Sequence, residues 1–185
     1  MRASLLADIG TTTWQIDPAV STAQFWVRHI LIPDVKGEFT RISGTLELNG
    51  ADISRSRVQA TIDAASIRTG SHLLDEHLRG PAFFDTARFP TLSFSSTQVA
   101  RTGLGELSVD GELNIRGLVR PVVLTVEGPE LISGEPGANP RLILGATTHI
   151  NRREFGLLWN PAREALRFLS GELVGIMLDL QCTRS

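Results

Sequence analysis

The segment 70–94, GSHLLDEHLRGPAFFDTARFPTLSF, concentrates the side chains of this sequence that could do chemistry: histidines, carboxylates, arginines and phenylalanines. Two histidines on one helix face could hold a metal ion, for which the usual spacing is four residues. His72 and His77 are five apart, which at 3.6 residues per turn separates them by roughly 140°. The sequence also has no cysteine and histidine spacing typical of a zinc site. We therefore predict no metal site.

Nucleophilic catalysis would need a serine near His77, with Asp75 orienting the imidazole. The segment has no nucleophile-elbow sequence, and the serines of the chain are scattered. We interpret His77 as a hydrogen-bonded packing residue and expect the protein not to be an enzyme. The alternative, an enzyme that acts on a lipid through His77 and a carboxylate, stays open.

These side chains are expected on a helix near residues 71–80. Ser71 is a candidate N-cap, Gly80 a C-terminal stop, and Pro81 forbids continuation. The i,i+4 spacing predicts two outward pairs, and His77 is expected on the side of the neighbouring leucines. The paired residues are Asp75 with Arg79 and His72 with Glu76.

The rest of the chain alternates apolar and polar residues with the period of a β-strand. Ala23, Phe25, Val27 and His29 fall on one side of such a strand, with Trp26 on the other. The connections are short, which favours antiparallel pairing, since parallel strands need long crossovers. The sequence thus predicts an all-β fold of about eight to ten strands with one helical insertion. Similar alternation occurs at 35–39, 46–48, 58–64, 92–94, 107–115, 122–126, 142–150 and 174–182.

Several positions on the predicted inner face carry very small residues. Small residues on strands leave volume or allow a ligand to approach closely, which favours a hollow barrel. An eight-stranded barrel can hold one small ligand. The alternative is that the glycines mark bulges and bends. The small inward residues are Ala23, Gly37, Gly44, Ala60, Ala64, Gly111 and Ala146.

Composition limits the classes of function. The chain has 185 residues, 42% of them hydrophobic, which suits one domain with its own core. The net charge of −2 comes from interspersed charges, which disfavours nucleic acid and anionic membrane surfaces as partners. Cys182 is the one cysteine, so no internal disulfide can form. No apolar run reaches the ~18 residues of a membrane span, so we expect no stable membrane insertion.

The first 18 residues lack the apolar run of roughly 7–15 residues that a secretory signal requires. We therefore expect a cytoplasmic protein, or a periplasmic one if a leader has been removed.

Five blocks in order carry a more specific resemblance. They are WQIDPAVSTAQFWVRH, DVKGEFTRISGTLEL, SIRTG followed by DEHLRGPAFFDTARFPTLSF, GELNIRGLVRPVVL, and ATTHINRREFGL. Together they resemble the YceI-like family of polyisoprenoid-binding proteins from about Trp14 to Cys182. The resemblance implies an extended lipocalin-like antiparallel β-barrel of about eight strands, with a long apolar channel and often a homodimer. We assign residues 1–13 to a tail and 14–185 to one barrel domain.

The resemblance and the inward register together predict the ligand site. We expect the barrel to bind a long-chain isoprenoid, a quinone or another lipid as a carrier, buffer or sensor, with no obligatory cofactor. A protein-interaction module with a filled barrel is a further alternative. Within the site, His77 and Arg152 could contact the polar end of the ligand. The predicted ligand-binding residues are Phe25, Val27, His29, Phe39, Leu46, Ala60, Ile62, His77, Phe83, Phe84, Phe94, Leu113, Arg152 and Ile176.

Two positions depart from the family pattern. Val20 stands where the family usually has a histidine before the serine of the first strand, and Leu74 stands where an arginine is common. This favours a less charged or shorter ligand than a pyrophosphate. Trp26 and Trp159 are candidate markers of a dimer surface.

Overall fold

Eleven strands account for most of the chain in the computed structural model, which describes residues 10–28, 34–133, 139–158 and 171–185. One α-helix, α1 (His72–Arg79), and three short 3-10 helices, η1 (Ile53–Arg55), η2 (Ala64–Ser66) and η3 (Arg152–Phe155), complete the described elements. The strands are β1 (Thr11–Ile16), β2 (Thr22–Val27), β3 (Val35–Phe39), β4 (Ile42–Asn49), β5 (Arg57–Asp63), β6 (Ile67–Arg68), β7 (Thr91–Gly103), β8 (Glu106–Ile115), β9 (Leu118–Ile132), β10 (Arg141–Asn151) and β11 (Leu173–Arg184).

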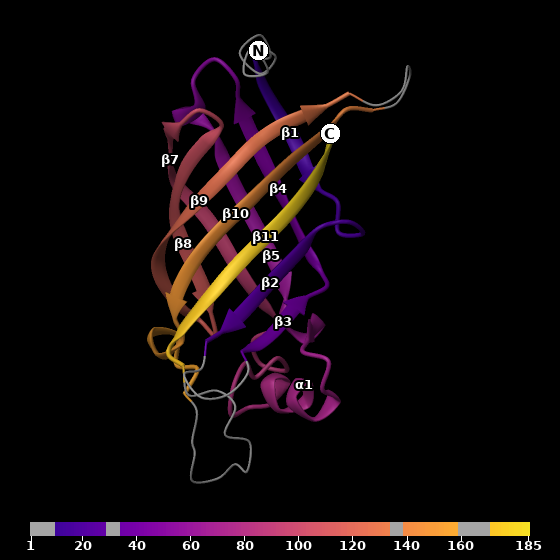
Figure 1. Ribbon diagram of the computed structural model, residues 1–185, viewed down its shortest axis with the longest axis vertical. Helices are drawn as coiled ribbons and strands as arrows, with labels where there is room; N and C mark the ends of the chain where they lie inside the picture. Colours follow the sequence, from indigo (N-terminus) through magenta and orange to yellow (C-terminus); the bar gives the residue numbers. More distant parts are fainter. Residues whose placement is uncertain (1–9, 29–33, 134–138, 159–170) are drawn as a thin grey trace.

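The strands form one closed antiparallel barrel (Figure 1). Three pairs of short strands act as interrupted long ones: β1 with β2, β3 with β4, and β5 with β6. Together with β7 to β11 they make eight long strands, each paired with its neighbours along the chain. The first closes on the last, where Ile16 pairs with Cys182. The predicted eight-stranded antiparallel barrel is confirmed.

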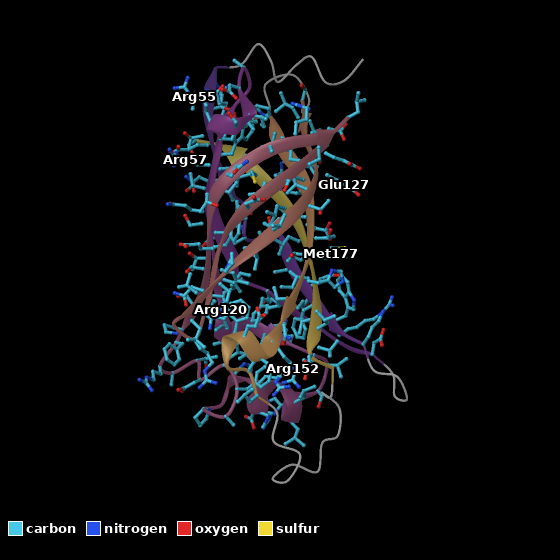
Figure 2. All side chains as sticks on the ribbon, turned by 90° about the vertical axis from the view of Figure 1, so that its left-hand side faces the viewer. Arg55, Arg57, Arg120, Glu127, Arg152 and Met177 are labelled. Atoms are coloured by element: carbon cyan, nitrogen blue, oxygen red, sulfur yellow. The ribbon has the colours of Figure 1, made fainter. Side chains whose placement is uncertain are left out.

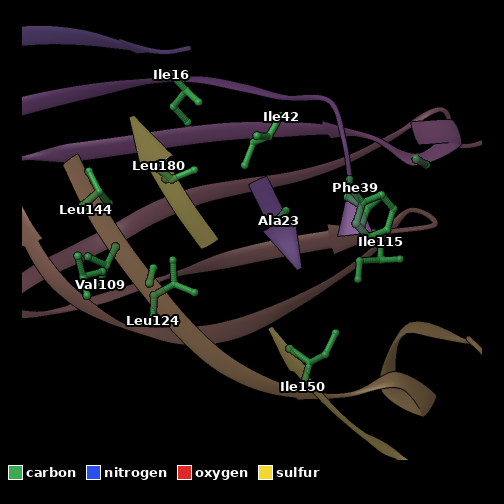
Figure 3. Packing of buried hydrophobic residues seen from close by; sticks show 14 of the residues in the cluster. Ile16, Ala23, Phe39, Ile42, Val109, Ile115, Leu124, Leu144, Ile150 and Leu180 are labelled. Carbon is green, nitrogen blue, oxygen red and sulfur yellow. The ribbon is translucent and has the colours of Figure 1, made fainter. Parts of the chain in front are cut away.

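Period-two alternation decides which side chains face inward. In β8, Leu107, Val109 and Ile115 are buried, whereas Glu112 is exposed. Figure 3 shows Val109, Leu124 and Leu144, from three different strands, directed into the same interior. The apolar core of this protein is therefore the lining of its barrel. The strands begin earlier than predicted, since β1 includes residues 11–13, which we had assigned to a tail.

Two inward glycines accommodate aromatic rings. A Cβ atom on Gly37 would lie 2.4 Å from Cζ of Phe25, and one on Gly111 would lie 2.4 Å from Cζ of Phe94. Each ring thus lies across a neighbouring strand at a position where no side chain fits beneath it. The expectation that these two glycines leave free volume was wrong, because phenyl rings take up the space.

Helix α1 lies across the end of the barrel opposite the start of β1 and the end of β11 (Figure 1). Its predicted limits are confirmed. Ser71 Oγ accepts a hydrogen bond from the Leu74 amide at 3.4 Å, and the Gly80 amide donates to the Glu76 and His77 carbonyls. The helix therefore ends where Pro81 begins the next turn.

The predicted helix faces are partly wrong. The exposed pair of His72 and Glu76 forms, with 3.7 Å between Nε2 and Oε1. Asp75 instead turns inward and is buried, so it does not pair outside with Arg79. Leu73, expected on the inner side, is 65% exposed. The buried face is centred on Leu74 and Leu78, because hydrogen bonds to the neighbouring strand orient the helix.

Candidate functional site: an apolar cavity along the barrel

The barrel encloses a cavity with about 190 Å³ of space for the centres of water-sized molecules. Its inward-facing lining is apolar almost throughout. All eight long strands contribute to it, the first of them through β2 and not through β1. Twelve of the fourteen predicted site residues line it. These are Phe25, Val27, Phe39, Leu46, Ala60, Ile62, Phe83, Phe84, Phe94, Leu113, Arg152 and Ile176.

The cavity runs between the two ends of the barrel. At the end where β1 begins and β11 ends, it is bounded by Ile53 of η1 and by Ser56, and at the other end by Leu78 and Arg152. Figure 2 shows Arg55 and Arg57 at one end and Arg152 at the other. On β8 the lining extends from Leu107 to Ile115. At ~3.3 Å per residue and a tilt of ~40°, this corresponds to about 20 Å along the barrel axis.

Aromatic rings close the α1 end of the cavity. Phe25 and Phe39 have ring centroids 5.8 Å apart, Phe39 and Phe84 are 5.7 Å apart, and Phe84 and Phe83 are 5.1 Å apart. The last two pairs meet nearly edge to face, the arrangement that aromatic quadrupoles favour. These rings form an apolar plug at the α1 end of the cavity.

Polar groups of α1 hold this plug against β6. The Arg79 guanidinium donates to the carbonyl oxygens of Ala65 at 2.9 Å and Ile67 at 2.6 Å. Oδ1 of Asp75 accepts from both the amide and the hydroxyl of Thr69, each at 2.7 Å. Asp75 thus satisfies buried donors at the rim and has a structural role.

Arg152 is a buried cation at the α1 end of the cavity. Its Nε donates to the Gly171 carbonyl at 2.7 Å and its Nη1 to the Leu157 carbonyl at 2.6 Å. Burial lowers the pKa of this guanidinium, the nearby Glu172 charge acts in the opposite direction, and Arg153 adds to the lowering. An arginine keeps its charge under such conditions. Arg152 therefore joins two loops and places a positive charge beside the apolar lining.

Of the two remaining predicted site residues, the structure describes only His77. His77 is half-buried on α1 and is not among the residues that line the cavity. His29 and Trp159 lie outside the described residues. The strongest sequence candidate for a catalytic base is thus separated from the apolar lining.

Trp26 packs on its own barrel. Its ring covers Gly175, where a Cβ atom would lie 2.1 Å from Cε2, and it meets His149 edge to face at 6.0 Å. The outward orientation was predicted correctly. The ring has contacts within its own chain, so its outward position is no longer evidence of a dimer surface.

The two departures from the family pattern do not reach the cavity. Val20 is 42% exposed in the turn between β1 and β2, and Leu74 is buried on α1 without lining the cavity. Neither substitution changes the polarity of the lining. The inference of a less charged ligand therefore loses its basis.

Sequence reasoning missed part of the lining. Alternation could have identified several inward residues that we did not name, because they share the register of named ones. Ile53 and Ser56 carried no such signal, since they lie at the β4–β5 connection. The strand residues missed include Ile42, Leu92, Ile115, Leu124, Leu144, Ile150 and Leu180.

Within the described ranges, no three histidine, cysteine or carboxylate side chains come together as metal ligands. In the same part of the chain, no helix has the length and apolar character needed to cross a membrane.

A closed antiparallel barrel around an apolar cavity, with a helix at one end, defines a lipocalin-like architecture suited to binding small apolar molecules. The particular family follows from comparison with known sequences. The family model of the YceI-like domain matches residues 14–182, and the chain belongs to this family.

Curated relatives agree with this assignment. A UPF0312 protein of Shewanella denitrificans is 31% identical over 140 residues, which is 75% of this chain and 72% of the relative. A UPF0312 protein of Staphylococcus aureus is 29% identical over 153 residues, which is 83% of this chain and 86% of the relative.

Solved structures share the fold. Burkholderia cenocepacia BcnA has a TM-score of 0.73 and 23% identity, with 90% of this chain and 98% of that chain covered. A polyisoprenoid binding domain from Saccharophagus degradans, implicated in plant cell wall breakdown, has a TM-score of 0.66 and 18% identity over 94% of this chain and 99% of that one. At these identities the likeness shows the fold alone.

Proposed function

We propose that the protein binds one long-chain apolar molecule, an isoprenoid, a quinone or another lipid, inside the barrel and acts as a carrier, buffer or sensor of it. The observation that supports this most directly is the apolar cavity that extends from η1 to α1. A related structure described as a polyisoprenoid binding domain is consistent with a ligand of this class.

The length of the cavity favours a chain of membrane-lipid size. About 20 Å of lining exceeds one leaflet of a bilayer, whose hydrocarbon core is ~30 Å thick in total. Each buried methylene contributes ~0.8 kcal/mol, so a five-carbon isoprene unit contributes about 3–4 kcal/mol. Association and ordering cost an estimated ~4–15 kcal/mol, which several units exceed. The ligand should therefore remain bound through purification.

The polar end of the ligand belongs at the α1 end in this proposal. Arg152 is the buried charged side chain among the described residues of the lining. An anionic or hydrogen-bond-accepting head group would gain most beside it. His77 is not part of this lining, which argues against both a ligand contact and a catalytic base there.

The two alternatives require features that the described cavity does not favour. An enzyme would need a base and a nucleophile at the lining, where aliphatic and aromatic side chains predominate. An interaction module with a filled barrel would need side chains that occupy the interior, whereas about 190 Å³ is accessible. Binding of an apolar chain is the function that the geometry supports best.

Mass spectrometry of an organic extract tests the proposal. The purified protein should release a long-chain molecule in near-stoichiometric amount. Ala60→Trp places an indole in the cavity and should abolish the signal, while Gln59→Trp, on the outer face of the same strand, should retain it. Extracts without any long-chain molecule, or equal loading of both variants, would contradict the proposal.

A further inference from the structure

Exposed apolar side chains are concentrated at one end of the barrel. Among the described residues, nine large hydrophobic side chains are exposed, and five of them belong to elements that meet at the α1 end (Figure 1). Leu104, in the β7–β8 turn, and Ile132 lie at the opposite end. The five at the α1 end are Leu73, Leu118, Val119, Leu158 and Leu173.

Arginines flank the apolar tip formed by Leu118 and Val119, at the start of β9. Arg116 and Arg120 lie on either side of it in sequence, and Arg88 approaches from the loop after α1. The guanidinium carbons of Arg88 and Arg116 lie 5.2 Å and 6.0 Å from the centroid of the Phe89 ring. Phe89 thus joins the β8–β9 turn to the loop that follows α1, and both exposed parts lie at the same end of the barrel (Figure 1).

The tip itself carries no carboxylate. No acidic residue occurs between Arg116 and Arg120. Glu172, at the same end, is engaged with Arg153 at 2.6 Å, and Glu76 faces His72. Apolar side chains surrounded by arginines match the boundary of a bilayer, where phosphate groups lie above the acyl chains.

We propose that the α1 end of the barrel is a docking surface for a lipid bilayer with anionic head groups. Leu73, Leu118 and Val119 enter the interface, and Arg88, Arg116 and Arg120 contact phosphates. The net charge of −2 does not prevent this, because the field of the membrane acts on charges within about one Debye length. The docking is electrostatic in part, and therefore reversible and sensitive to salt.

The surface is continuous with the cover of the cavity. β6 pairs only with β3 among the described strands, and the ladder between β5 and β7 ends at Asp63 and Thr91, so α1 covers a gap in the wall. Leu78 of this helix lines the cavity, whereas Leu73 is exposed. This inference rests on the proposed function, since docking here brings the covered end of a lipid-binding cavity to the source of its ligand.

Co-sedimentation with vesicles tests the surface. The full chain should sediment with vesicles of phosphatidylglycerol and phosphatidylcholine, and less with phosphatidylcholine alone or in 0.5 M salt. Leu118→Asp and Leu73→Asp should each weaken binding about tenfold. Arg88→Glu should weaken binding to anionic vesicles and leave the weak binding to neutral ones unchanged.

Leu104→Asp is the matched control, because Leu104 is 98% exposed at the other end of the barrel. It should bind vesicles like wild type. Equal losses in Leu104→Asp and Leu118→Asp, or no sedimentation of wild type, would overturn the docking surface. The lipid extracted from the same preparations is measured separately, so a protein that carries lipid but does not sediment loses only this inference.

Discussion

Single buried polar groups in this protein have structural roles that their residue types alone do not reveal. Asp75 and Arg79 are spaced for an exposed ion pair, yet each bonds to the segment that contains β6. Buried donors and acceptors need partners, and the loops around α1 leave several backbone groups without ladder neighbours. The titratable side chains of segment 70–94 that have described contacts therefore serve mainly to position the plug.

Asp75→Ala should lower the free energy of unfolding by about 1–3 kcal/mol, because the amide and hydroxyl of Thr69 lose their common acceptor. Urea unfolding followed by circular dichroism measures the change. Glu76→Ala, at the exposed neighbouring position, should change stability by less than about 0.5 kcal/mol. Equal stability of the two variants would show that the bonds to Thr69 contribute nothing.

Cys182 should be nearly unreactive in the folded protein. Burial, with a smaller contribution from the Asp17 charge, raises the pKa of its thiol from 9.0 to about 11. At pH 8 the thiolate fraction falls about a hundredfold, and a disulfide reagent should react correspondingly slower than in guanidinium. As the pH rises, the thiol ionises at a lower pH in the unfolded chain than in the folded one. The contribution of Cys182 to the free energy of unfolding is therefore complete below pH 9 and declines as the pH rises toward 11. Equal reaction rates in both states would contradict this burial.

At three places an aromatic residue on one strand packs over a glycine on the neighbouring strand. Phe25 over Gly37 and Phe94 over Gly111 do this inside the barrel, and Trp26 over Gly175 does it outside. An aromatic ring that lies on a glycine covers backbone and stiffens the pairing of two strands. Each of these positions therefore needs glycine as long as the aromatic ring lies over it.

Gly175→Ala should destabilise the protein by about 1 kcal/mol or more, because the new methyl group would meet three atoms of the Trp26 ring within 2.6 Å. In a Trp26→Ala background the same change should cost much less. A double-mutant cycle measured by thermal or urea unfolding gives the coupling energy. Additive effects would indicate that the ring moves away freely.

The whole molecule is a closed barrel whose core is also its cavity. Closure pairs the described strands on both sides along most of their length, and near β6, where the ladder is interrupted, α1 covers the gap. The cavity lining therefore stabilises the fold and recognises the ligand with the same side chains. Substitutions that fill the interior should alter binding more than folding, provided the volume is available.

We expect a homodimer in solution, as the resemblance to the YceI-like family implies. Sedimentation velocity at micromolar concentration should give about twice the monomer mass of 20.1 kDa. A Leu118→Asp variant should remain dimeric, because the proposed docking surface faces a membrane. A monomer at all concentrations would remove the dimer, and dissociation of the variant would assign the α1 end to the dimer contact.

The sequence by itself determined the antiparallel all-β class, the inward register of most lining residues and the limits of α1. These follow from local rules: side chains alternate on a strand, and capping residues satisfy the ends of a helix. The order of the five blocks was enough to identify the family. Twelve predicted residues lie on the cavity for the same reason, since inward register and lining coincide in a closed barrel.

Only the tertiary structure decided how the side chains of those elements are oriented and packed. It turned Asp75 inward and Leu73 outward, because contacts with the β6 segment orient α1 more strongly than its own i,i+4 pairs. It placed phenyl rings over Gly37 and Gly111, since each ring reaches across to the strand paired with its own. It also removed His77 from the lining. Side-chain orientation depends on which groups of other segments lie within contact distance, and the order of residues along the chain does not contain those distances.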